Sequence, residues 1–156
     1  MEIMEFDIPV QQPAELVWRS HVKNFQVTLP ACNPGHYKKV EYVDGPPLAA
    51  GGVVKIYYVE EFGHYDYVKF RWDEMDHDNY FCKLTIFEGG FISKKFASLV
   101  YHHRVIPSSD DLSCTVSWKI EYDDLEQHDC HDILKEELTK FCNLISDHID
   151  DTIKAT

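Results

Sequence analysis

The 156-residue sequence is short of basic residues. It contains 15 lysine and arginine residues against 27 aspartate and glutamate residues, a formal net charge of −12. A surface this acidic repels phosphate groups, so we expect neither a nucleic-acid partner nor an anionic membrane as partner. The sequence also lacks an apolar run long enough to span a bilayer, which excludes a membrane-spanning helix.

Closely paired cysteines are also absent. The five cysteines are scattered, and no Cys-x-x-Cys pair occurs among Cys32, Cys82, Cys114, Cys130 and Cys142. This pattern predicts neither a zinc knuckle nor a disulfide framework, and we expect no metal and no cofactor. The acidic start has no basic segment followed by an apolar run, so we expect no signal peptide. The sequence therefore indicates a reduced, cytoplasmic protein.

The length and composition are those of one globular domain. A chain of this size buries about 70% of its unfolded surface and needs no covalent staple. Hydrophobic residues make up 44% of the sequence and aromatic residues 13%. We predict a single domain over residues 1–156.

Hydrophobic periodicity predicts a strand and then short helices at the start. Apolar residues alternate with polar ones from Met4 to Val10, which is typical of a strand with one wet face. Pro13 can begin a helix, and apolar residues then recur at helical spacing as far as Phe25. We expect Pro30 and Pro34-Gly35 to break this helical region into short pieces.

From Tyr37 onward the hydrophobic period changes to two. The predicted strands, rich in Val, Ile, Tyr, Phe and Trp, are Tyr37–Val43, Val53–Val59, Tyr65–Met75, Asn79–Phe87, Phe96–Ile106 and Ser113–Tyr122. Short turn segments separate them, which favours an antiparallel meander over parallel crossovers.

The last part of the chain predicts one long amphipathic helix. Its apolar stripe runs over about four turns and consists of Leu134, Leu138, Phe141, Cys142, Ile145 and Ile149. Asp124 or Asp129 can cap its start. The apolar stripe must be covered, and the sheet is the large partner available.

Three motifs, in order along the chain, resemble those of the birch-pollen-allergen (pathogenesis-related class-ten) plant protein family, within the START-like superfamily. They are the glycine-rich segment Gly51–Ile56, the Asp-His turn at the end of Tyr67–His77, and the Glu-Gly-Gly turn of Thr85–Gly90. The resemblance implies an α+β helix-grip fold: a curved seven-stranded antiparallel sheet wrapped around the long helix, with two short helices after the first strand. It also implies a roomy cavity for flavonoids, cytokinins, fatty acids, steroids or alkaloid precursors.

Strand alternation combined with this resemblance predicts the inward-facing residues. They are Val54, Ile56, Tyr58, Tyr67, Phe70, Cys82, Leu84, Ile86, Leu99, Tyr101, His103, Val116, Trp118, Ile120, Leu134, Leu138, Phe141 and Cys142, with His21 near the end where the cavity closes. No acidic residue is predicted among them. Such a mostly apolar wall is typical of a small-molecule pocket, although the same residues would also fill an ordinary core.

Three departures from the family narrow the expected chemistry. Phe70 stands where cytokinin-binding relatives carry an acidic side chain, and a phenyl ring cannot accept a hydrogen bond. Cys82 and Tyr101 stand where the norcoclaurine-synthase branch has its lysine and aspartate, while Lys83 points to the opposite face. The stiffened loop that begins at Asp44 weakens a phosphate-cradling role for the glycine-rich segment.

The histidines are the most individual feature of this sequence. His102 and His103 are adjacent on a strand, so they face opposite sides and cannot chelate one metal. His103 is predicted to face inward, where it either contacts the ligand or is satisfied by a hydroxyl such as that of Tyr101. The residues around His128–Asp132 and Glu74–Asp78 have metal-ligand types but not the spacing of a metal site.

Two functions follow from this sequence. The first is binding, storage or transport of a hydrophobic or aromatic plant small molecule by a monomer or weak homodimer. The alternative is a cofactor-independent isomerase, cyclase or lyase of plant specialised metabolism, with His103 and Tyr101 as catalytic residues for proton transfer. A ribonuclease activity gains no support, because no two histidines with a phosphate-binding lysine are expected to meet in one pocket.

Overall fold

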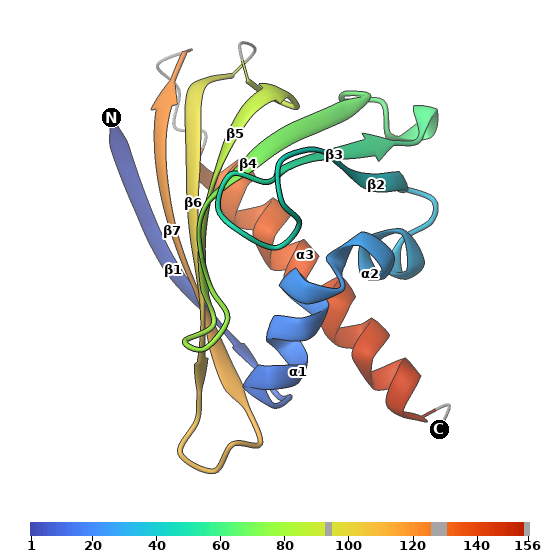
Figure 1. Ribbon diagram of the computed structural model, residues 1–156, viewed down its shortest axis with the longest axis vertical. Coiled ribbons are helices and arrows are strands. Elements are labelled where there is room, and N and C mark those ends of the chain that lie inside the picture. Colours follow the sequence, from blue (N-terminus) through green and yellow to red (C-terminus); the bar gives the residue numbers. More distant parts are fainter. Residues whose placement is uncertain (93–94, 126–130, 155–156) are drawn as a thin grey trace.

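The computed structural model describes residues 1–92, 95–125 and 131–154. The strands are β1 (Glu2–Val10), β2 (Tyr37–Asp44), β3 (Val53–Tyr58), β4 (Tyr67–Asp76), β5 (Phe81–Gly89), β6 (Phe96–Pro107) and β7 (Cys114–Asp124). The helices are α1 (Ala14–Trp18), the π-helical turn η1 (Arg19–Lys23), α2 (Phe25–Cys32), the 3-10 turn η2 (Glu60–Phe62) and α3 (His131–Lys154). The fold is the predicted α+β helix grip, with a curved sheet around α3 (Figure 1).

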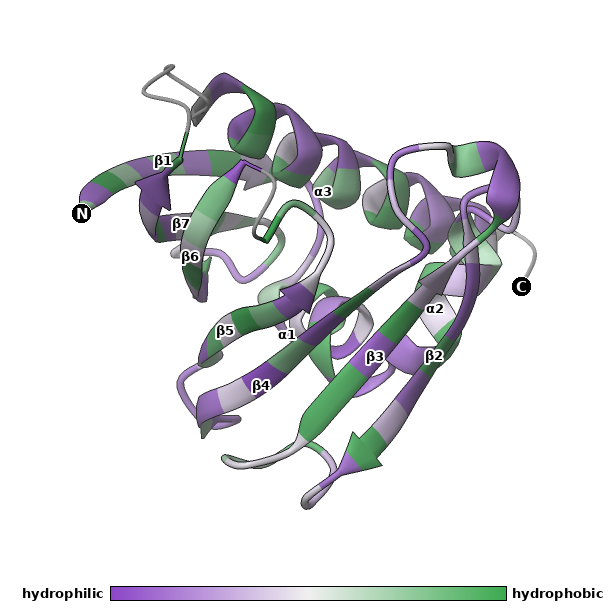
Figure 2. Ribbon diagram, turned by 90° about the horizontal axis from the view of Figure 1, so that it is seen from above, coloured by the Kyte–Doolittle hydropathy of each residue, from purple (hydrophilic) through white to green (hydrophobic). Residues whose placement is uncertain are grey.

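The predicted antiparallel meander is confirmed. The seven strands lie in the order β1-β7-β6-β5-β4-β3-β2, so each strand from β2 to β7 pairs with its neighbour in sequence. Strand β1 pairs with β7 along its whole length, from Glu2 opposite Tyr122 to Val10 opposite Cys114. Figure 2 shows hydrophobic and hydrophilic residues alternating along the strands, because one face covers the interior and the other meets solvent.

Two short helices follow β1 as predicted, but the break between them is not where the sequence placed it. The helical region divides at Asn24, whose amide donates to the carbonyl of Arg19 in a wide turn. Pro30 lies inside α2 and does not break it. A proline six residues into the helix removes only the hydrogen bond to the carbonyl of Gln26, and Gln26 is exposed to water.

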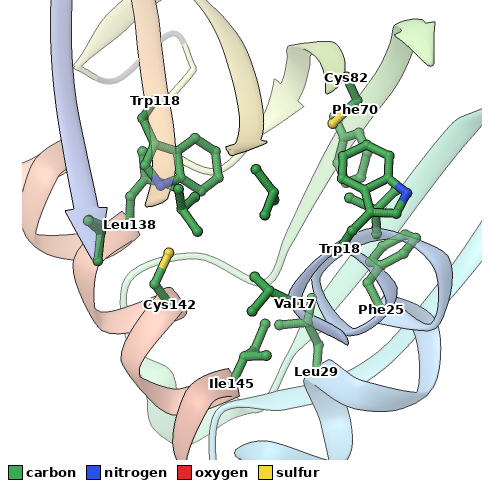
Figure 3. Close-up of a cluster of buried hydrophobic side chains, with 14 of the residues drawn as sticks. Val17, Trp18, Phe25, Leu29, Phe70, Cys82, Trp118, Leu138, Cys142 and Ile145 are labelled. Atoms are coloured by element: carbon green, nitrogen blue, oxygen red, sulfur yellow. The ribbon is translucent and has the colours of Figure 1, made fainter. Parts of the chain in front are cut away.

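Helix α3 presents its predicted apolar stripe to the sheet. Leu134, Leu138, Cys142, Ile145 and Ile149 are buried. Figure 3 shows Leu138, Cys142 and Ile145 pointing toward the same interior as side chains from α1, α2 and the sheet. The predicted capping residue Asp129 lies outside the described residues. Asp124 is the last residue of β7, so the prediction that it caps the helix is wrong. No helix within the described residues is long and apolar enough to cross a membrane.

The Asp-His turn after β4 ties the short helices to the glycine-rich loop. The indole Nε1–H of Trp18 donates to Nδ1 of His77 at 3.2 Å, and Nε2 of His77 lies 3.0 Å from the carbonyl oxygen of Leu48. A ring that accepts at Nδ1 must carry its proton on Nε2, so His77 donates to Leu48. This bridge ties α1 to the glycine-rich loop.

The glycine-rich loop uses its own amides. Gly45 donates to the side chain of Asp44, Leu48 to the hydroxyl of Tyr42, Gly51 to the carbonyl of Trp72 and Gly52 to that of Ala49. Because these donors are already paired within the protein, they form no cradle for phosphate.

Candidate functional site

A pocket of about 650 Å³ lies between the concave face of the sheet and α3, with η1 and α2 against it. Strands β3 to β7 contribute mostly apolar and aromatic side chains to its wall. Two sets of polar side chains in the wall, one of histidines and one of tyrosines, come from different parts of the fold. Charged side chains also line the pocket, among them Lys95, Glu137 and Lys140. This volume is typical of small-molecule sites in proteins.

Most of the predicted wall residues do line this pocket. They are His21, Ile56, Tyr58, Phe70, Cys82, Leu84, Ile86, Tyr101, His103, Trp118, Leu138 and Phe141. Strand alternation brings the sheet residues to one face, and the helical repeat of α3 brings Leu138 and Phe141 opposite them.

Tyr67 does not line the pocket, and that prediction is wrong. Its ring lies beneath the Nζ of Lys55 at 4.6 Å on the outer face of the sheet, and its hydroxyl interacts with Glu88. Tyr67 and Phe70 are three positions apart, so a period of two cannot place both on the same face. Val68, Phe70 and Trp72 are the β4 residues that line the pocket.

A further set of predicted residues is buried in the core and does not reach the pocket wall. These residues are Val54, Leu99, Val116, Ile120, Leu134 and Cys142. Val54 pairs with Tyr42 and with Phe70 in the sheet, next to the region where Phe25 of α2 packs on Phe70 and Trp72. Facing inward is therefore necessary but not sufficient for contact with the pocket, because helices pack directly on part of the sheet.

The first polar set is a pair of histidines, which we call the histidine pair: His21 of η1 and His103 of β6. Nδ1 of His21 lies 3.0 Å from Nε2 of His103. On the other side of His103, Sγ of Cys82 lies 3.9 Å from Nδ1. The ring of Trp118 packs edge-on at 4.5 Å between centroids. The predicted partner of His103 was Tyr101, and the structure provides His21 instead.

Both histidines of the pair are held neutral. Burial lowers the pKa of His103 to about 3. Burial, and then the proximity of His103, lowers the pKa of His21 well below its ordinary value. Burial raises the pKa of the Cys82 thiol, which therefore keeps its proton. One arrangement of protons fits both contacts of His103: the Cys82 thiol donates to Nδ1 of His103, and Nε2–H of His103 donates to Nδ1 of His21. In this arrangement Nε2–H of His21 lies outside the chain of bonds.

The expectation that no two histidines and a lysine meet in one pocket is wrong, because His21, His103, Lys95 and Lys140 all line this one. The charge on a protonated histidine is what binds a phosphate group, and a neutral pair supplies none. A base with a pKa near 3 is also a weak proton acceptor at pH 7. The chemistry of the histidine pair at neutral pH is therefore that of a neutral hydrogen-bonding unit.

The second polar set lies beside the connection between β3 and β4, and we call it the tyrosine cluster: Tyr37, Tyr58, Tyr65 and Tyr101. The ring centroid of Tyr58 lies 5.4 Å from that of Tyr37 and 4.9 Å from that of Tyr65. Phe62 of η2 stacks on Tyr58 at 4.8 Å. Burial raises the pKa of each of the four phenols, so all are neutral donors at pH 7.

Glu137 of α3 faces the tyrosine cluster and contradicts the expectation that no acid lines the interior. Its side chain belongs to the pocket wall. Its charge contributes, after burial, to the raised pKa of all four phenols of the cluster. Burial, and then the charge of Glu136, raises the pKa of Glu137 to about 7.

The sequence contains a signal from which the inward position of Glu137 could have been predicted. It lies three residues after Leu134 and four before Phe141, so it stands on the apolar stripe of the helix. Acidic residues are rarely buried, so a carboxyl group on the apolar stripe of a helix indicates a candidate binding site. Tyr37 was harder to find, because β2 is irregular between Tyr37 and Lys39 and simple alternation fails there.

Within the part of the chain that the structure describes, the residues that resemble metal ligands form no metal centre. Among the described residues, no group of three or more His, Cys, Asp or Glu side chains is arranged to hold a metal ion. Residues 128–130 of one predicted cluster lie outside the described part of the chain. In the other, Asp76 accepts bonds from Asp78 and Asn79 and so serves the turn itself.

Sequence relatives of this chain are plant allergens. It is 24% identical over 110 residues to the root allergen protein of Taraxacum officinale, a match that covers 70% of this chain and 69% of that protein. It is 28% identical over 102 residues to the major pollen allergen Cor a 1 isoforms 5, 6, 11 and 16 of Corylus avellana, covering 65% of this chain and 62% of that protein. The latter match thus spans less than two thirds of its relative.

Solved structures share the fold at low sequence identity. Ara h 8.0201 superposes with a TM-score of 0.82 at 16% identity, covering 96% of this chain and 98% of that one. Norcoclaurine synthase from Thalictrum flavum, in complex with dopamine and hydroxybenzaldehyde, superposes with a TM-score of 0.72 at 17% identity, covering 96% and 87%. At these identities the likeness shows the fold alone. The sequence profile of one family matches residues 1–156 in full, and the chain therefore belongs to the Pathogenesis-related protein Bet v 1 family.

Proposed function

We propose that this protein binds a small aromatic or hydrophobic molecule in the pocket between the sheet and α3, and that it stores or carries this molecule. One observation carries the proposal: the pocket of about 650 Å³ has a wall in which apolar and aromatic side chains predominate, with polar groups at defined places. Such a wall stabilises a ligand through burial of its rings, while the polar groups orient it. Norcoclaurine synthase, a structural neighbour, was solved with two small aromatic molecules.

The alternative, proton transfer on a bound ligand by His103 and Tyr101, has less support. His103 has a pKa of about 3 and is already bonded within the protein, which makes it a poor base at pH 7. Burial raises the pKa of Tyr101 well above its ordinary value, so this phenol neither loses a proton readily nor acts as a strong acid. Binding without chemical change accounts for these groups better.

The test is displacement of an environment-sensitive dye. Anilinonaphthalene sulfonate should brighten in the presence of the folded protein, and 1-naphthylmethanol should displace it. We expect an affinity of micromolar order, about −8 kcal/mol. Titration calorimetry with 1-naphthylmethanol would give the same constant without a dye.

A matched pair of variants shows whether binding occurs in the pocket. Leu84→Trp fills the wall from the inner face of β5, whereas Lys83→Trp places the same ring on the opposite face of that strand. Binding should be lost in the first variant and kept in the second. Binding that survives in both variants, or a wild-type protein that binds neither the dye nor the alcohol, would contradict the proposal.

A further inference from the structure

Three carboxyl groups line the pocket, those of Glu61, Glu136 and Glu137, and Glu137 is the one that is partly buried. None of the ion pairs within 4 Å in the described part of the chain involves Glu137. A partly buried carboxylate with no such partner costs free energy that a satisfied polar group does not. A bound ligand that supplies the missing partner would recover that cost.

The charged groups around Glu137 do not supply this partner themselves. Lys140 and Glu136 flank it on α3, and both side chains are exposed. Lys95, which precedes β6, places its Nζ 5.1 Å from the centroid of the Phe91 ring. Both lysines act on the Glu137 carboxyl only weakly, since its pKa stays raised in spite of them. The remaining charged or titratable wall residues near the β3–β4 connection are His36, Glu61 and His64.

The pocket wall beside Glu137 is formed by the electron-rich rings of the tyrosine cluster. Tyr37 of β2, Tyr58 of β3 and Tyr65 of the β3–β4 connection face Glu137, and so does Tyr101 of β6. The faces of such rings attract a cation, and the attraction grows when the cation is removed from water. Neutral phenols also offer hydroxyl oxygens as acceptors. Aromatic faces together with one carboxylate are the chemistry that recognises an ammonium group.

We propose that Glu137 and the tyrosine cluster form a subsite for a protonated amine, so that the preferred ligand is an aromatic amine. This inference rests on the proposed function, because it assigns one end of the same ligand. The aromatic body would lie along the apolar wall near Leu84 and Trp118, and the ammonium group would pair with Glu137. The neutral histidine pair bears no charge that would compete for either end.

Three probes of the same ring system and different charge test the proposal. They are 1-naphthylmethylamine, 1-naphthylmethanol and 1-naphthoate, titrated by calorimetry at about pH 8, where the amine is still largely protonated and Glu137 is ionised. The wild-type protein should bind the amine about tenfold more tightly than the alcohol, as expected for a charge-assisted bond of about 1.4 kcal/mol. It should bind the naphthoate more weakly than the alcohol.

The variant Glu137→Gln keeps the shape of the side chain and removes the charge. It should lose the preference for the amine and still bind 1-naphthylmethanol, which shows that the pocket has survived. Glu74→Gln makes the same change of net charge at an exposed position outside the pocket and should keep the tenfold preference. At about pH 6 the wild-type preference should shrink, because protonation neutralises a carboxyl whose pKa is about 7.

The outcomes separate this inference from the proposed function. If no probe binds, the proposed function fails and the inference with it. If amine and alcohol bind equally well to the wild-type protein, or if Glu137→Gln keeps the amine preference, the pocket stands and the amine subsite is wrong. If the naphthoate binds most tightly, the lysines at the rim control selectivity, and the proposal is overturned.

Discussion

The two polar sets of this pocket differ in how the free-energy cost of burying their polar groups is offset. In the histidine pair, His21 and His103 bond to each other at 3.0 Å, and both rings stay neutral. In the tyrosine cluster, Glu137 shares its surroundings with neutral phenols and has no ion-pair partner within the described residues. The two histidines are bonded to each other, whereas Glu137 beside the tyrosine cluster lacks a positively charged partner within 4 Å among the described residues.

This contrast shows which polar groups in a pocket belong to the fold and which belong to a ligand. Buried polar groups that hydrogen-bond to one another rigidify the protein and need no bond from a ligand. A group that is partly buried and unpaired weakens the fold until something binds, which is the usual relation between activity and stability at a site. Changes to the histidine pair should therefore alter stability, and changes at Glu137 should alter ligand choice.

The largest expected effect is loss of stability in acid through the histidine pair. The pKa of His103 is about 3 in the folded protein, whereas an ordinary histidine has a pKa of about 6.5. Between these two pH values the unfolded chain binds a proton that the folded chain does not. The stabilisation is complete above that pH and falls as the pH drops. Acidification from about pH 7 to about pH 4 should remove about 3 kcal/mol through His103 alone.

Urea unfolding of the wild-type protein and of a double variant isolates this effect. Carboxylates also titrate in this range, but they remain in the variant that carries both His21→Leu and His103→Leu. The double variant should lose at least about 3 kcal/mol less than the wild-type protein over the same pH interval, because His21 also takes up a proton on unfolding. If the two proteins lose the same free energy of unfolding, His21 and His103 take up protons in the folded state as readily as in the unfolded state.

A smaller effect is expected when only one member of the pair is removed. His103→Leu leaves Nδ1 of His21 buried without its partner and should cost about 2 kcal/mol at pH 7. Adding His21→Leu should recover part of that loss, because the orphaned ring is gone, and a double-mutant cycle by urea unfolding measures the coupling. His102→Leu is the matched control, since this neighbour bonds Glu121 on the outer face and should cost less than about 1 kcal/mol. Additive single changes would contradict a coupled pair.

At Glu137 the expected stability effect has the opposite sign. The folded pKa of about 7 lies above the unfolded value of about 4.3, so folding takes up a proton between these limits. Stability from this group is complete below the unfolded pKa and is lost as the pH rises through 7. Glu137→Gln should therefore raise the free energy of unfolding by about 1 kcal/mol at pH 8, after allowance for residual solvent contact, and change little near pH 4.

Urea unfolding of Glu137→Gln at both pH values tests this sign. The exposed-site variant Glu74→Gln should show no such pH-dependent gain. A loss of stability in Glu137→Gln at pH 8 would mean that the carboxylate is well paired in the empty protein.

The sequence predicted the fold well because its periodicities are local. The alternation of β3 to β7 and the stripe of α3 require only neighbouring residues, and these predict the sheet, the long helix and most of the pocket wall. The partner of His103 lies 82 positions away on η1, and no local pattern reveals such a pair. The errors have equally physical causes: Tyr67 was assigned against the period of its own strand, and Pro30 was expected to end a helix that tolerates it near its last turn.

The smallest expected effect separates two tyrosines that the sequence treated alike. Tyr58 lies in the pocket wall and interacts through its hydroxyl with Tyr65, whereas Tyr67 lies outside beneath Lys55. Tyr58→Phe removes one neutral hydrogen-bonding group from the tyrosine cluster and should weaken binding of 1-naphthylmethylamine about threefold, within the range of a single neutral hydrogen bond. Tyr67→Phe deletes the same hydroxyl from the outer face and should leave the affinity unchanged in calorimetry. Both variants keep the aromatic ring, so neither creates a cavity. If Tyr67→Phe weakened binding as much as Tyr58→Phe, the ligand would contact the outer face of the sheet, and the assignment of the site to the inner pocket would be wrong.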